Sequence, residues 1–290
     1  LPPQRLQLHR HRCAICALLT FQPQQRPRST AVLITKRIAM ADASIAVVPT
    51  RYQASTFPQR WQHKIEVVHE GVPEAMLQLP RLQQLTIAEG TTLGPEIPVI
   101  TFISRNLEPM RGFPTFMRAL PTLLANHPTV QVVIVGGDEV SYSSAPGDGR
   151  SWRDHLLEEL GNRIDRQRVH LFGRMPHDQL QKLYRRSDLH VYLSKAFVLS
   201  WSLMELMACG TPVLAEANPM MKELIKPGVN GALWSGTPEY LAQAILTLLK
   251  DPGELKRWGL QAKQELKPNY LQQSCLDQLE RLLKKQEAYF

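Results

Sequence analysis

The chain has 290 residues, enough for one large domain or two smaller ones, and a hydrophobic content of 43% that is ordinary for a globular protein. Its net charge of +8 is concentrated at one end, because residues 1–40 contain seven arginines and lysines and no acid. The remaining residues are close to neutral, which argues against nucleic acid as a partner. No apolar run approaches the roughly 20 residues needed to span a bilayer.

Residues 1–36 are rich in Gln, Arg, Pro and His and show no sustained hydrophobic period. We expect a disordered or mistranslated leader on a fragment of a longer gene product, although a transit peptide would have a similar composition. Cys13 and Cys16 form a C-x-x-C pattern beside two histidines, but no second ligand pair frames a zinc site there. The four cysteines fit a reducing cytoplasm better than a disulfide framework.

The regular pattern of secondary structure begins at residue 37. We expect a short helix over 37–43, strands over 44–48 and 64–68, and a helix over 51–60. Two strands are too few for a stable domain, so residues 37–73 are interpreted as the remnant of a larger domain with its hinge. Residues 74–96 are interpreted as a polar linker.

Buried strands then alternate with helices from residue 97 to residue 252, which indicates a doubly wound, Rossmann-like parallel sheet of the α/β class. The expected strands span residues 98–103, 130–135, 169–172, 189–193, 211–215 and 232–234. The expected helices span residues 114–126, 152–160, 178–187, 201–209, 218–225 and 238–250. Two amphipathic helices, over 253–266 and 269–287, complete the chain.

The most informative stretch is 194–214, which follows a strand and contains the next helix. Ser200 is a plausible N-cap whose hydroxyl can accept from a first-turn amide, and Gly210 can end the helix in a left-handed conformation. Free amides at such a helix N-terminus bind phosphate, and Glu205 is placed to accept hydrogen bonds from sugar hydroxyls. On this stretch alone, a buried crossover helix with one acid at its solvated edge is an equally good interpretation.

Several segments carry a family pattern, and in a parallel sheet their loops meet beyond the carboxyl ends of the strands. These segments are Ser104-Arg105 with Arg111-Gly112, Val133–Asp138, Phe172-Gly173 with Leu183-Tyr184 and Ser187-Asp188, Met204–Val213, and the stretch 48–73. They resemble, in order, the G-R…K-G, V-G-x-G, F-G…L…Y…A-D and L-E-A-M-A-x-G-x-P-V motifs and the hinge of the retaining family-4 glycosyltransferases, which have the GT-B fold. The resemblance covers residues 40–287, mainly the donor-binding half.

The resemblance implies roles for the residues of these loops. Arg105 and Arg111 would be catalytic, stabilising the charge of a leaving nucleoside diphosphate. The implied donor-binding residues are Gly136, Gly137, Gly173, Arg174, Met175, Phe197, Val198, Leu199, Ser200 and Glu205. Glu205 would hold the ribose hydroxyls, and the backbone near Arg174 would contact the base. The nucleotide-sugar would be a substrate with no cofactor, and the missing Asp-x-Asp motif predicts no metal.

Two departures from the family pattern affect the predicted activity. The family usually has a glutamate that contacts the donor sugar where this chain has Phe197, and its Gly-Phe-Gly becomes Val198-Leu199-Ser200. We also expect most of the acceptor domain, with its glycine-rich loop and usual active-site histidine, to be missing from this chain. We therefore expect donor binding with poor turnover, and we expect the apolar stripe of the last helix to pack on residues 37–73.

The favoured function is a retaining, hexosyltransferase-type glycosyltransferase, with this chain carrying mainly the donor-binding half. The alternative is a catalytically impaired nucleotide-sugar-binding module from a truncated gene. A GT-B epimerase would need acidic and histidine groups that are not aligned here. The acceptor, whether a sugar, a lipid-linked molecule or a small molecule, is not readable, nor are the base and the transferred sugar. We expect a cytoplasmic protein without a transmembrane segment, and peripheral membrane association stays open.

Overall fold

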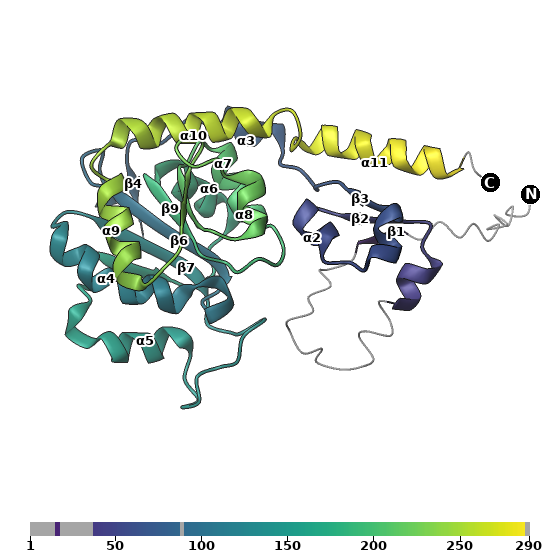
Figure 1. Cartoon of the computed structure of the whole chain (residues 1–290). Helices are drawn as coiled ribbons and strands as arrows, with labels where there is room; N and C mark the ends of the chain where they lie inside the picture. The colour runs from purple at the N-terminus through teal and green to yellow at the C-terminus, as the bar shows by residue number, and fades with distance from the viewer. Residues whose placement is uncertain (1–14, 18–36, 88–89, 288–290) are drawn as a thin grey trace, which may run out of the picture. The chain divides into compact units, whose positions relative to one another are not determined.

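The computed structural model describes residues 15–17, 37–87 and 90–287, and these form two compact units. The larger unit comprises residues 71–273, and the smaller one takes in the described residues up to Glu70 and from Ser274 onward (Figure 1). Cys13 and most of the expected leader lie outside the described residues.

The larger unit is built on a six-stranded parallel sheet. Its strands are β6 (Val99–Asn106), β7 (Gln131–Gly137), β8 (Val169–Phe172), β9 (Leu189–Tyr192), β10 (Val213–Glu216) and β11 (Ala232–Trp234). They lie in the order β11-β10-β9-β6-β7-β8, so the chain reverses direction across the sheet between β6 and β9. The predicted doubly wound sheet is confirmed, and this reversal is where such sheets bind ligands.

Helices cover both faces of this sheet (Figure 1). They are α4 (Phe113–Asn126), α5 (Trp152–Leu160), α6 (His177–Arg186), α7 (Trp201–Ala208), α8 (Pro219–Leu224), α9 (Pro238–Leu248) and α10 (Pro252–Leu266). Helix α4 packs against α5 and α9, whereas α7 packs against α6 and α10. Phe116, Leu120 and Leu123 of α4 recur at helical spacing and are fully buried. The burial of each side chain stabilises the fold by about 1.5–3 kcal/mol.

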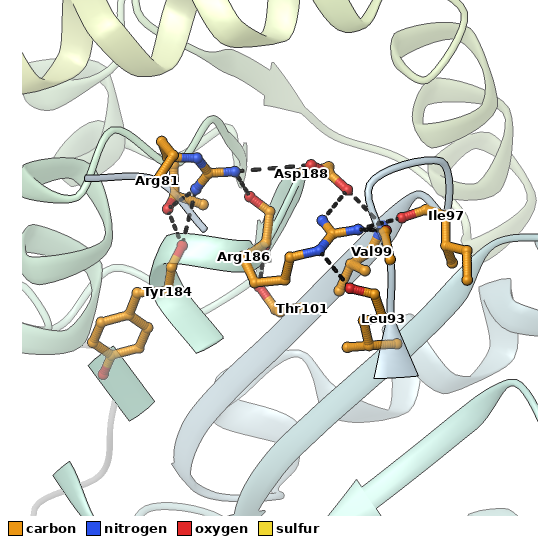
Figure 2. A network of polar contacts seen from close by, with 11 residues as sticks. Arg81, Leu93, Ile97, Val99, Thr101, Tyr184, Arg186 and Asp188 are labelled. Atoms are coloured by element: carbon orange, nitrogen blue, oxygen red, sulfur yellow. Dashed lines mark hydrogen bonds and ion pairs between the residues drawn. The ribbon is translucent and has the colours of Figure 1, made fainter. Parts of the chain in front are cut away.

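The expected linker is an integral part of the larger unit. It contains α3 (Glu74–Gln78) and the antiparallel strands β4 (Leu85–Thr86) and β5 (Thr92–Leu93). Figure 2 shows how two arginines attach this segment to the sheet domain. Arg81 donates to the Tyr184 carbonyl at 3.0 Å and to the Thr211 hydroxyl at 2.9 Å. The segment is therefore held by polar contacts that its own composition does not reveal.

Arg186 makes the second attachment, from the last residue of α6. Its guanidinium is buried and donates to the carbonyls of Leu93, Gly94 and Ile97 and, at 2.7 Å, to Asp188 (Figure 2). The same Asp188 carboxylate accepts from the Val99 amide at 2.9 Å, at the first residue of β6. One ion pair thus joins the expected linker, the end of α6 and the central strand.

The smaller unit is a three-stranded parallel sheet with a small apolar core. Its strands are β1 (Ile15–Ala17), β2 (Ile45–Val48) and β3 (Ile65–Val67), and β1 comes from the expected leader. The predicted 51–60 helix is wrong in extent, because α2 (Arg51–Ser55) stops early and a 3₁₀ turn, η1 (Gln59–Lys64), follows. Pro58 lies between them, and proline disfavours helical conformation in the residue before it.

The last helix, α11 (Gln272–Glu287), begins next to the larger unit, where Val72 pairs with Leu271. From Ser274 onward it groups with the smaller unit. Burial, together with the charge of Glu70, raises the pKa of the Cys275 thiol, so Glu70 of the smaller unit lies near this helix. The grouping agrees with the expectation that the helix packs on residues 37–73.

Candidate functional site

A cavity of about 460 Å³ opens beyond the carboxyl ends of β6, β7 and β9, at the point where the chain reverses across the sheet. We call it the rim cavity. Its lining residues are Ile103, Ser104, Arg105, Arg111, Val135, Gly136, Arg174, Met175, Leu180, Tyr184, Tyr192, Ser194, Ser200, Trp201 and Ser202. Of the predicted site residues, Arg105, Arg111, Gly136, Arg174, Met175 and Ser200 are among them.

The N-terminus of α7 forms part of the cavity wall. Ser200 is the N-cap residue, but its side chain does not cap the helix and instead shares a hydrogen bond of 2.7 Å with the Ser202 hydroxyl. The predicted capping bond is therefore wrong, and no side-chain cap covers the first-turn amides. An uncapped helix start of this kind attracts anions through its amides and its dipole.

Gly112 fixes the loop that carries Arg111. Its φ of +76° is left-handed, and a Cβ there would lie 2.3 Å from the Leu193 Cβ, so only glycine fits. The Lys195 amide donates to the Met110 carbonyl at 3.0 Å, which ties this loop to the segment after β9. In the sequence, the Arg111-Gly112 pair is the one feature that indicated the close approach of Gly112 to Leu193.

Arg111 is a cation with spare donors. One terminal nitrogen lies 3.5 Å from the Ser194 hydroxyl, and the guanidinium lies 5.4 Å from the Tyr142 ring centroid. Its Nε is buried without a hydrogen-bond partner, and the described residues offer it no ion pair. Burying an unpaired charge is costly, so this arrangement favours an anionic ligand.

The other two predicted arginines differ from Arg111. Arg105 is exposed on the cavity edge and makes no side-chain hydrogen bond to the described residues. Arg174 forms an ion pair of 2.8 Å with Glu139, and both side chains are exposed. An exposed pair of this kind contributes about 0–1 kcal/mol, so a ligand could displace it readily.

Glu205 lies one helical turn into α7 and is not among the cavity-lining residues. Its carboxylate oxygens are 3.0 and 3.2 Å from His177 Nε2, and the Tyr184 hydroxyl lies close to it. Burial, and then the Glu205 charge, raise the pKa of Tyr184 far above its ordinary value, so Tyr184 stays a hydrogen-bond donor. Sequence reasoning missed both partners, although Leu183-Tyr184 belonged to a quoted motif.

The remaining predicted residues lie beside the cavity without lining it. Gly137 ends β7, Gly173 is exposed just after β8, and Leu199 is buried. Phe197 packs against Tyr142 with ring centroids 4.7 Å apart, and Val198 follows it in the same half-buried loop. The cavity lining also includes residues that were not predicted as site residues, among them the buried Tyr192 and the 66% exposed Trp201.

Two family models match the chain in sequence. The model for glycosyl transferases group 1 matches residues 90–265, which is more than half of the chain. The model for the glycosyl transferase family 4 group matches residues 18–76, which includes part of the expected leader. Among the described residues no helix is long and apolar enough to cross a membrane.

The curated relatives described next are also glycosyltransferases. A D-inositol 3-phosphate glycosyltransferase of Rhodococcus jostii is 30% identical over 173 residues, covering 59% of this chain and 36% of the relative. The corresponding protein of Rhodococcus opacus is 26% identical over 259 residues, covering 87% of this chain and 56% of the relative. The chain thus spans about a third to just over half of the length of these relatives.

Solved structures are similar in fold. HepE of Anabaena, crystallised with UDP and glucose, has a TM-score of 0.71 at 19% identity, covering 88% of this chain and 67% of that one. A sucrose-phosphate synthase of Thermosynechococcus elongatus has a TM-score of 0.69 at 21% identity, and the match covers 92% of this chain and 64% of the synthase. With its parallel sheet, its rim cavity and its match over residues 90–265, the chain belongs to the GT-B glycosyltransferases of the glycosyl transferases group 1 family.

Proposed function

We propose that this chain carries the donor-binding half of a retaining glycosyltransferase that transfers a sugar from a nucleotide-sugar to an acceptor. The observation that carries the proposal is the rim cavity, where the unpaired Arg111 and the uncapped start of α7 face one space. Both features favour an anion, and a diphosphate is the anionic part of a nucleotide-sugar. UDP and UDP-glucose, which HepE carries in its crystals, are the first ligands to test.

The proposed reaction breaks the bond between the anomeric carbon and the terminal phosphate oxygen. The oxygen of an acceptor hydroxyl bonds to the anomeric carbon instead, and the hydroxyl proton passes to the departing diphosphate. Negative charge gathers on the departing diphosphate, and Arg105 and Arg111 would stabilise it together with the α7 amides. Fixed cations that strengthen their contacts as this charge develops lower the barrier. Because these residues supply the positive charge, we propose transfer that needs no divalent metal.

Glu205 would hold the ribose hydroxyls, with Tyr184 and His177 fixing its carboxylate. The base would lie near Met175, and the sugar near the Phe197 loop. The acceptor would be a sugar, a lipid-linked molecule or a small molecule. The free thiols of Cys209 and Cys275 fit a reducing compartment, so we propose the cytoplasm as the site of the reaction.

A second candidate is a nucleotide-sugar-binding protein with impaired transfer. Phe197 favours it, because an apolar ring that packs on Tyr142 cannot accept hydrogen bonds from a donor sugar. The two candidates differ in acceptor-dependent release of nucleoside diphosphate from the donor. Release near background would favour the binding protein, whereas robust release would favour the transferase.

The test of donor binding is calorimetric titration with UDP, GDP and ADP. At least one should bind, and Glu205→Ala should weaken it by about 1–3 kcal/mol, since ribose hydroxyls would lose their acceptor. The matched control is Glu254→Ala, because Glu254 is also a helical glutamate with one ion-pair partner, Arg257 at 2.9 Å. Equal affinities of the Glu205→Ala and Glu254→Ala proteins would remove Glu205 from the site.

A further inference from the structure

Tyr192 is the last residue of β9, and its side chain reaches the rim cavity although the residue is only 3% exposed. Its hydroxyl is buried and makes no hydrogen bond of normal geometry with the described residues. Buried hydroxyls in folded proteins nearly always have a partner, because an unmade hydrogen bond leaves the desolvation cost uncompensated. An unpartnered hydroxyl on a cavity wall is therefore a group that a ligand can satisfy.

The surroundings of this hydroxyl determine what kind of ligand fits. Burial raises the pKa of Tyr192, whereas the Ser194 hydroxyl and the Ser200 amide, as hydrogen-bond donors, and the Arg111 charge lower it. These donors approach the phenol oxygen outside normal hydrogen-bond geometry, and the proton of the phenol has no acceptor. Arg111 Nε is itself buried without a partner. The Ser194 hydroxyl already faces Arg111 at 3.5 Å. The neighbourhood thus has an excess of hydrogen-bond donors, which a ligand must meet with acceptor oxygens.

Charge narrows the ligand to an anion. The buried acid on the same loop as Arg111 is Glu108, and one of its oxygens accepts from the amides of Ser141, Tyr142 and Ser143 at 2.9–3.0 Å. Glu108 Oε2 is engaged with the 141–143 backbone, Oε1 is buried without a partner, and the carboxylate forms no ion pair with Arg111. A cation or a neutral apolar ligand would leave the guanidinium and the phenol unsatisfied.

We propose that the Tyr192 hydroxyl donates a hydrogen bond to the terminal phosphate of a nucleoside diphosphate, beside Arg111 and the start of α7. This inference rests on the proposed function and assigns a diphosphate-selective residue within the same site. It also accounts for Phe197. With Phe197 where the family has a carboxylate for the donor sugar, the Tyr192 and Arg111 donors would give the site its selectivity for the diphosphate.

The test uses Tyr192→Phe, which removes the hydroxyl and keeps the ring. UDP, GDP and ADP and their monophosphates are titrated by calorimetry into the wild type, Tyr192→Phe and a matched Tyr240→Phe control. Tyr240 is 67% exposed on α9, outside the rim cavity. For the diphosphate that binds, we expect Tyr192→Phe to lose about tenfold or more in affinity, equivalent to about 1.4 kcal/mol. Monophosphate affinity should change less than twofold, and Tyr240→Phe should match the wild type throughout.

The unliganded protein supplies a second readout. Removing a hydroxyl without a partner should leave the melting temperature unchanged or raise it by up to about 4 °C, while the shift produced by the diphosphate becomes smaller. A clear fall in the unliganded melting temperature would show a structural partner and overturn the inference. Unchanged diphosphate affinity, or an equal loss for monophosphate, would also overturn it and leave the proposed function standing. Failure of the wild type to bind any of the diphosphates would remove both.

Discussion

The buried Arg186 offers the sharpest test of what holds the larger unit together, and we expect Arg186→Met to destabilise this unit strongly. Arg186 is 2% exposed, and its guanidinium donates to the carbonyls of Leu93, Gly94 and Ile97 and to the Asp188 carboxylate (Figure 2). Methionine has a similar length and can fill the volume, but it donates nothing. The substitution therefore leaves three carbonyls and one carboxylate without their donor.

The expected cost follows from these contacts. Leaving a buried carbonyl without its donor costs about 1–3 kcal/mol, and three carbonyls lose theirs, whereas the Asp188 side chain is 38% exposed and can be solvated by water. Asp188 keeps the Val99 amide and lies 3.8 Å from Arg81, which moderates the loss. We therefore expect about 3–4 kcal/mol, which for a unit of this size is a fall in melting temperature of roughly 6–16 °C.

The assay is urea and thermal unfolding of Arg186→Met beside Arg118→Met. Arg118 also holds a carboxylate with two nitrogens, at 2.7 and 2.6 Å from Glu159, but on the surface. We expect that control to cost about 0–1 kcal/mol. Equal losses in the two variants would refute the reasoning that burial, rather than bidentate geometry, sets the value of the Arg186 contacts. In Arg186→Met, UDP affinity should fall too, since α6 also positions Tyr184 and His177.

Two further predictions concern the loop of Arg111 and the response to acid. Gly112→Ala should lower the free energy of unfolding by about 1–3 kcal/mol, because residue 112 has a left-handed φ and its Cβ would clash with Leu193. The substitution should also weaken UDP binding in calorimetry. A wild-type affinity would show that the loop relaxes around the new side chain. Burial lowers the pKa of His190 to about 3, so the unfolded chain takes up this proton below about pH 6.5 and the folded chain does not. The free energy of unfolding should therefore fall as the pH drops from about 6.5 toward 3, by about 2 kcal/mol between pH 6.5 and 5. In urea unfolding, His190→Gln should show a smaller fall over the same pH range, because the unfolded variant has no imidazole at this position to protonate.

The core of the fold was readable from the sequence because its signals are local. Nearly continuous apolar strands such as 130–135, in which Gln131 is the one polar residue, alternate with amphipathic helices and specify a buried parallel sheet before any contact is known. The stop of α7 was equally local, since Gly210 adopts φ +74° and the Thr211 amide donates to the Leu206 carbonyl at 3.1 Å. The 74–96 segment was misread because its order depends on Arg81 and Arg186, whose partners are distant backbone carbonyls. Hydrophobic periodicity carries no record of such contacts.

In the candidate site, too, some residues could be predicted from the sequence and others could not. Arg105, Arg111, Gly136 and Ser200 could be placed on one rim because parallel strands put their carboxyl ends together, whatever the packing around them. The orientation of the Ser200 hydroxyl could not be predicted, because this hydroxyl hydrogen-bonds to the Ser202 hydroxyl and leaves the α7 amides without a side-chain cap. Tyr192 was hidden for a different reason. Strand β9 places His190 and Tyr192 on one face, yet His190 is buried against Thr101 at 3.0 Å whereas Tyr192 lines the cavity, so the sequence does not tell a phenol turned toward a cavity from one turned into the core. Only the absence of a hydrogen-bond partner distinguishes the two, and that absence is a property of the folded structure.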